Sequence, residues 1–121
     1  MPSEAQEPAA LPYIRSGGIG DPFFYDEFNR VRIFHGANRV IKAFPWYTPD
    51  MIDSEAEYDM MEGLGFTVIR LGYMWTGAEP EANRFNQTYI DTIKTIVSKL
   101  AGRGIYTLLD MHEDVLSSKF W

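Results

Sequence analysis

The chain has 121 residues, of which 45% are hydrophobic and 15% aromatic, a composition typical of a folded domain with a core and not of a disordered segment. Its 11 basic and 17 acidic residues give a net charge of −6, which argues against nucleic acid as a partner because phosphate binding needs a basic surface. It contains no cysteine, which excludes disulfide bonds and thiolate metal sites.

The N-terminal segment differs from the rest of the chain. Residues 1–11 are polar and rich in proline and alanine, so they are predicted to form a flexible tail ahead of one domain over residues 12–121. The start of the chain lacks a basic region followed by an apolar core, and no signal peptide is expected. No apolar run approaches the roughly 20 residues that a membrane-spanning helix requires. The sequence leaves the compartment open.

Three segments are predicted to be β-strands because they are rich in branched and aromatic residues and end in polar ones. They are "RVRIFHGAN" (residues 30–38), "FTVIRLGYMW" (66–75) and "IYTLLDMHED" (105–114). Their near-continuous apolar runs are typical of strands buried on both faces of a parallel sheet. Upstream, "FFYDEFNRVRIF" predicts a β-hairpin that turns near residues 27–29.

Two helices are predicted between these strands. Ser54 and Glu57 fit a capping box for the first helix, and Gly65 is expected to end it. Asn86 is predicted to cap the second helix, which should end at one of the glycines at positions 102 and 104. Apolar residues follow this cap at helical spacing: Tyr89, Ile93, Ile96, Val97 and Leu100.

The order of elements is therefore a hairpin followed by β-α-β-α-β, which predicts an α/β fold with parallel strands. An open doubly wound sheet and a closed (β/α)8 barrel both fit this order. The first strand is followed by a long loop, "ANRVIKAFPWYTPD", and not by a glycine-rich phosphate loop, which favours the barrel. Because a whole barrel needs about 250 residues, we expect this chain to form the N-terminal portion of a (β/α)8 TIM barrel, incomplete in this chain.

Polar side chains gather at the ends of the three predicted strands, where a barrel places them on one rim. They are Asn38, Lys42, Arg70, Tyr73, His112 and Asp114. Arg70 lies within an apolar strand and must be paired, either with a structural partner or with a substrate group. A lone His112 would more often be a core residue, but Asp114 should point to the same face, which favours a functional pair. His35 is expected mainly to pack.

Three aromatic residues, Trp46, Tyr47 and Trp75, could stack on sugar rings or on a lipid, or could simply pack in the core and rim. A metal site is not expected. The only local ligand set is His112, Glu113 and Asp114, and adjacent residues on a strand point to opposite faces. No cofactor is implied by any motif.

Three stretches, "FHGANRVIKAFPWY", "LGFTVIRLGYMWTGAEPE" and "GIYTLLDMHEDVLSSKF", together resemble glycoside hydrolase family 5, and within it the endoglycoceramidase-related enzymes. The resemblance runs from about residue 23 to the C-terminus. It implies a (β/α)8 barrel and retaining hydrolysis of the β-glycosidic bond between glycan and lipid in glycosphingolipids. A glycolipid or another β-glycoside is then the expected substrate, and a transient contact with a membrane surface is compatible with it.

The resemblance also implies roles for single residues. Lys42, Arg70, His112 and Asp114 match positions that line the sugar subsite next to the cleaved bond. Glu113 departs from the family pattern, because a neutral residue is expected there. The two catalytic glutamates belong to the fourth and seventh strands of the barrel, so no catalytic residue is expected in this chain, and the isolated chain should be inactive. The alternative is a truncated, non-catalytic protein that binds glycolipid, or binds a partner through its unpaired sheet edge.

Overall fold

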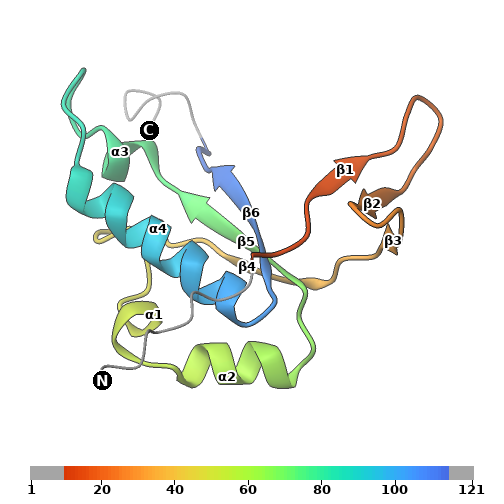
Figure 1. The fold of residues 1–121 in the computed structure, drawn as a ribbon. Coiled ribbons are helices and arrows are strands. Elements are labelled where there is room, and N and C mark those ends of the chain that lie inside the picture. Colours follow the sequence, from red (N-terminus) through yellow and green to blue (C-terminus); the bar gives the residue numbers. More distant parts are fainter. Residues whose placement is uncertain (1–9, 115–121) are drawn as a thin grey trace, which may run out of the picture.

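The computed structural model describes residues 10–114 of the chain (Figure 1), so the predicted tail of residues 1–11 lies almost wholly outside the described residues. The described part contains two three-stranded sheets and four helices. In chain order the elements are β1 (Ile14–Ser16), β2 (Phe24–Asp26), β3 (Val31–Arg32), β4 (Gly36–Arg39), α1 (Asp50–Asp53), α2 (Ala56–Gly63), β5 (Val68–Tyr73), α3 (Trp75–Ala78), α4 (Gln87–Gly102) and β6 (Tyr106–Met111). None of the helices described is long and apolar enough to span a membrane.

The predicted hairpin is confirmed, and β1 adds a strand that the sequence did not predict. The strands β1, β2 and β3 pair antiparallel in this order, and Figure 1 shows them projecting to one side of the helices. The turn is built around Asp26, whose fully buried carboxylate accepts hydrogen bonds from the backbone N–H groups of Phe28 (2.9 Å) and Arg30 (3.0 Å). Asn29 supplies the left-handed backbone of the turn, with φ of 58°.

The carboxylate of Asp26 also binds the side chains of Arg30, at 2.7 Å, and Arg32, at 3.4 Å. Burial alone would favour the neutral acid. The hydrogen bonds from the Arg30 backbone and side chain and from the Phe28 backbone act in the opposite direction, and together they lower the pKa of Asp26 to about 2. A buried carboxylate thus orders the hairpin turn.

The second sheet confirms three parallel strands that are adjacent in chain order. β4 pairs with β5 and β5 pairs with β6, both parallel. The single strand predicted over residues 30–38 is wrong, because the chain changes partners within it. Its first part, β3, pairs with β2, whereas β4 pairs with β5. Between them, the carbonyl oxygen of His35 accepts hydrogen bonds from the backbone of Thr67 (2.9 Å) and Val68 (3.3 Å), which fixes where the second pairing begins.

The helices bury their apolar faces against one side of the parallel sheet. The long helix α4 starts as predicted: the side chain of Asn86 accepts a hydrogen bond from the N–H of Tyr89 at 3.2 Å. It ends at Gly102, and Gly104 follows with φ of 75°. The buried core contains Met51, Tyr58, Met61, Ile69, Leu71, Ala78, Tyr89, Ile93, Ile96, Leu100 and Ile105.

The capping box predicted for α2 is wrong in its details. The Ser54 hydroxyl accepts a hydrogen bond from the N–H of Ala56 at 3.1 Å, and the helix has no side-chain cap. Glu57 instead forms an ion pair with Arg39 of β4, in which both the donor and the acceptor are charged. Gly65 follows the helix with φ of 73°, as expected for the residue that terminates it.

The strand β6 lies at the edge of the parallel sheet, and burial of both its faces was predicted wrongly. Leu108, Leu109 and Met111 are 58%, 51% and 54% exposed. Alternation along a strand points Leu108 to one face and the other two to the opposite face. Among residues 10–114, β6 pairs only with β5, which leaves its other edge open, and the exposed residues on its two faces show that neither face is fully covered.

Candidate functional site

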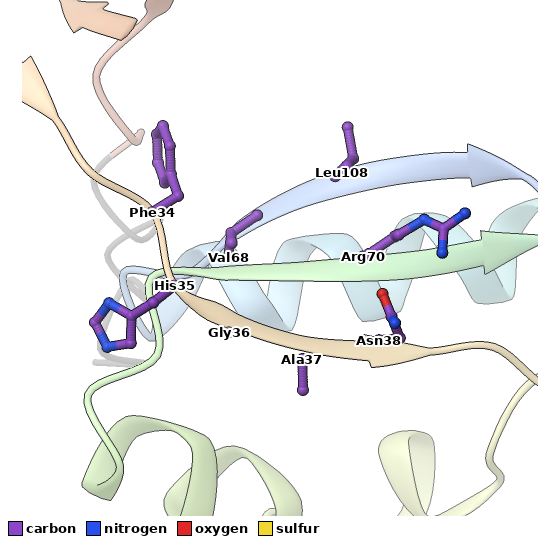
Figure 2. Close-up of a pocket in the computed structure, with 8 residues that line it drawn as sticks. All are labelled: Phe34, His35, Gly36, Ala37, Asn38, Val68, Arg70 and Leu108. Carbon is purple, nitrogen blue, oxygen red and sulfur yellow. The ribbon is translucent and has the colours of Figure 1, made fainter. Parts of the chain in front are cut away.

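A polar site begins on the face of the parallel sheet that points away from the core. Asn38 of β4, Arg70 of β5 and Leu108 of β6 lie side by side in the strand register. Figure 2 shows their side chains on one face, with Val68 beside them and Ala37 pointing to the other face. These residues line a pocket of about 400 Å³, together with Phe34, His35 and Gly36. Arg70 is therefore half-buried, with 40% of its side chain exposed, and not enclosed in the core.

Arg70 finds its partner on the neighbouring strand. A terminal guanidinium nitrogen of Arg70 lies 2.7 Å from Oδ2 of Asp110, the fifth residue of β6. The same oxygen lies 2.8 Å from Nδ1 of His112, so one carboxylate contacts both side chains. Asp110 was missed in the sequence, although it is two residues before His112 and must share its face.

The site continues beyond the end of β6. Nε2 of His112 lies 3.4 Å from Oδ1 of Asp114, in agreement with the predicted pairing of these two residues on one face. The other oxygen of Asp114 lies 2.7 Å from Nζ of Lys42, in the loop that follows β4. The hydrogen bond and the charge of Lys42, with a smaller contribution from His112, hold the pKa of Asp114 below its ordinary value.

We call this connected set, Lys42, Arg70, Asp110, His112 and Asp114, the polar network. It joins all three parallel strands or the loops that follow them, as expected for strand ends that meet on one rim. Two permanent donors, a guanidinium and an ammonium, stand at its ends. Between them lie two carboxylates and an imidazole. This array can bind a ligand that carries several hydroxyl groups, which both donate and accept hydrogen bonds.

Other predicted residues lie outside the polar network. Tyr73 points to the helix-facing side, where its ring centroid lies 5.7 Å from that of Tyr89, because it is three residues from Arg70 on a strand of period two. Trp75 begins α3 and is 56% exposed. His35 is exposed, with its ring edge-on to that of Phe66. Glu113 is exposed between the two network residues that flank it.

Trp46 and Tyr47 line a separate pocket of about 340 Å³. Its other walls are Phe44, Pro45, Thr76, Gly77, Pro80, Asn86, Thr88, Tyr89 and Thr92. Trp46 and Tyr47 are half-buried and also pack against the core. The loop that follows β4 thus carries Lys42 in the polar network and, four residues on, an aromatic wall of the second pocket. In the part of the chain that the structure describes, no group of three or more side chains is placed to hold a metal ion.

Comparison with known proteins identifies the family. The model of the cellulase domain, glycosyl hydrolase family 5, matches residues 25–121. The chain belongs to glycosyl hydrolase family 5. A solved structure, described as the crystal structure of endogalactoceramidase, superimposes with a TM-score of 0.68 at 31% identity, covering 86% of this chain and 23% of that one. The expected fold is confirmed: the three parallel strands and their helices are a partial (β/α)8 TIM barrel, with an open sheet.

Within the family, the similarity lies with the endoglycoceramidases. The chain is 44% identical over 100 residues to an endoglycoceramidase of Cyanea nozakii, and 46% identical over 100 residues to one of Hydra vulgaris. It is 31% identical over 96 residues to endoglycoceramidase I of Rhodococcus hoagii, strain 103S. These matches cover 78–79% of this chain but only 19–20% of the relatives, so the chain spans about a fifth of their length.

Proposed function

We propose that this chain supplies part of the sugar-binding rim of a retaining glycosidase of the endoglycoceramidase type, which hydrolyses the bond between the glycan and the lipid of a glycosphingolipid. The observation that supports the proposal is the polar network, which lies within residues 25–121, the part of the chain that matches the family model. The substrate is a glycolipid or a related β-glycoside.

In this proposal the polar network binds the sugar unit next to the cleaved bond. Arg70 and Lys42 donate charge-assisted hydrogen bonds, and His112 and Asp114 offer acceptors to sugar hydroxyls. Each of these groups is held by a neighbour within 3.4 Å, so little side-chain freedom remains to be lost on binding. The residues orient the substrate and transfer no protons.

The catalytic carboxyl pair is proposed to lie elsewhere in the barrel. Retaining hydrolysis needs a nucleophile and a protonated acid about 5–5.5 Å apart. Asp110 is bound to Arg70 and His112, and Asp114 is bound to Lys42, which lowers its pKa and makes it a poor acid at neutral pH. Carboxylates held in this way are suited to positioning, and we expect the isolated chain to be inactive.

The second pocket is proposed to contact the same substrate farther from the cleaved bond. Trp46 and Tyr47 offer aromatic faces that suit either a sugar ring or the apolar part of a lipid. Phe44, at the same pocket, is 85% exposed, and Trp75 is 56% exposed. Amphipathic aromatic side chains favour the boundary between water and lipid, so a transient contact with the membrane that carries the glycolipid belongs to this proposal.

A chimera tests the proposal. The matching region of the Hydra vulgaris endoglycoceramidase is replaced by residues 25–121 of this chain, and hydrolysis of a fluorescent glycosphingolipid is measured. The proposal requires the chimera to cleave between glycan and ceramide. Lys42→Ala should then lower kcat/KM by roughly 10- to 150-fold, the equivalent of about 1.5–3 kcal/mol for a hydrogen bond to a charged group.

Lys94→Ala is the matched control, because it removes a lysine that is 71% exposed on α4 and pairs only loosely with Asp91, at 3.9 Å. It should leave kcat/KM unchanged. Equal losses in the two variants would show that Lys42 has no specific role. A folded chimera that binds the glycolipid without cleaving it would favour the alternative, a non-catalytic glycolipid-binding protein.

A further inference from the structure

Asp110 lies between a permanent cation, Arg70, and a titratable side chain, His112. Its Oδ2 atom contacts the guanidinium of Arg70 at 2.7 Å and Nδ1 of His112 at 2.8 Å. Asp110 and His112 are only 20% and 17% exposed, so both contacts are largely shielded from water. Because Arg70 is always charged, the carboxylate beside it acts as an acceptor, and Nδ1 of His112 must be the donor.

The other ring nitrogen of His112, Nε2, differs from Nδ1 in its hydrogen bonding. Nε2 of His112 is buried and has no hydrogen-bond partner among the described residues. Its nearest polar neighbour is Oδ1 of Asp114, 3.4 Å away, while the other oxygen of Asp114 is bound to Lys42. A buried polar atom without a partner marks a place where a ligand can complete the hydrogen bonding.

We propose that Asp110 is a positioning residue that holds His112 in the Nδ1–H tautomer, so that Nε2 and Asp114 present two adjacent acceptors to one hydroxyl group of a ligand. That the ligand is a sugar rests on the proposed function. It also gives a selectivity rule. A hydroxyl can donate into this pair of acceptors, whereas a carboxylate or phosphate would meet only lone pairs and is rejected.

Histidine ring NMR on the intact chain tests this without a substrate. The chain has two histidines, His35 and His112, and the exposed His35 is an internal reference, with no hydrogen bond to its ring among residues 10–114. Protonated and unprotonated ring nitrogens have well-separated ¹⁵N shifts. At pH 8 we expect His112 to be almost entirely Nδ1–H, whereas His35 should favour Nε2–H, as free neutral histidine does.

Asp110→Asn should remove this preference, because the amide can turn its N–H₂ toward Nδ1 and its oxygen toward Arg70, which selects the wrong tautomer. Asp114→Asn is the matched control, since it changes the partner of Nε2 and should leave Nδ1 protonated. Asp110→Ala serves as the second variant if the Asn variant loses the amide spectrum of the folded chain.

The result that overturns the inference is a wild-type His112 that is Nε2–H, mixed, or doubly protonated at pH 8. Retention of Nδ1–H in a folded Asp110 variant overturns it as well. If neither Asp110 variant folds, the wild-type spectrum decides alone. Because no substrate is needed, a failure here leaves the glycosidase proposal standing, and an inactive chimera leaves the tautomer result standing.

Discussion

Replacing Gly36 by alanine should separate β4 from β5 and so disturb the pocket beside Arg70. Gly36 is the first residue of β4 and pairs with Val68 of β5. A Cβ atom at this position would overlap the carbonyl oxygen of Val68 and lie 2.8 Å from its carbonyl carbon. Both are backbone atoms, so no side-chain rotation relieves the clash, and one strand must move.

Forcing an extra carbon into a packed site costs about 1–3 kcal/mol, and relief by strand movement would weaken the β4–β5 ladder by that amount. The matched control is Gly63→Ala, at the last residue of α2, where an added Cβ meets nothing within 4 Å. Alanine is favoured over glycine in a helix by up to about 1 kcal/mol. The two substitutions, chemically identical, should therefore change stability in opposite directions.

Native-state amide hydrogen exchange followed by NMR separates these effects, because it reports each element by itself. In Gly36→Ala, exchange of the amides of β5 should be faster by roughly 5- to 160-fold, the equivalent of the 1–3 kcal/mol above. In Gly63→Ala, exchange in α2 should be unchanged or slower. Unchanged exchange in β5 of the Gly36→Ala protein would refute the close approach of the two strands.

Three further outcomes are expected. Because its folded-state pKa of about 2 lies below the ordinary value of 3.8, ionised Asp26 stabilises the hairpin above about pH 4, and this stabilisation is lost as the pH falls through about 2. The amide shifts of Phe28 and Arg30 should move near pH 2 in the wild type and not in Asp26→Asn; movement centred near pH 4 would contradict the assignment. The isolated chain should unfold over a broad temperature range, because the three large apolar residues of β6 are about half exposed. Each of them loses about 1 kcal/mol of the stabilisation that full burial would give. A sharp, cooperative transition of a monomer would count against this. The isolated chain should not hydrolyse an aryl β-glucoside, and turnover that disappears in Glu113→Gln would reveal a catalyst of its own.

The sequence predicted the parts of the fold that depend on local periodicity. The second helix was predicted from its cap at Asn86 to an end at one of two glycines, at positions 102 and 104, and it ends at the first of them, because apolar spacing and capping chemistry act within a few residues. The parallel order followed from the repeated βα unit. The split between β3 and β4 could not be predicted, since the change of pairing partner within residues 30–38 is set by strands elsewhere in the chain. Where one strand ends depends on backbone atoms of Thr67 and Val68, more than thirty residues away.

The same limit applies to the capping box at Ser54. The sequence motif is present, but Glu57 is drawn to Arg39 on a different element, and a tertiary ion pair replaces a local hydrogen bond. Short motifs predict a contact only when no stronger partner is brought near by the fold. The prediction that β6 is buried on both faces failed for a related reason. Apolar side chains indicate that a strand can be buried, but they do not provide the neighbouring elements that would cover it.

The candidate site shows both the use and the limit of strand alternation. Alternation along the strand predicted that His112 and Asp114 lie on the same face. Counting two residues toward the N-terminus from His112 would also have predicted Asp110 on that face, and Asp110 connects Arg70 to the histidine. The same rule would have removed Tyr73 from the rim. Alternation could not predict that Trp46 and Tyr47 line a second pocket, because they lie in a loop without regular secondary structure.

The net charge of the whole chain differs from that of the polar network. The chain carries −6, which would suggest a surface that repels acidic ligands and attracts cations. Within the polar network, two cations, Lys42 and Arg70, balance two carboxylates, Asp110 and Asp114. The Nδ1–H tautomer proposed above for His112 carries no charge, and with it the charges of the network sum to zero. In the proposed function, selectivity would then rest on the direction of donors and acceptors and not on attraction at a distance, as suits an uncharged, hydroxyl-rich sugar.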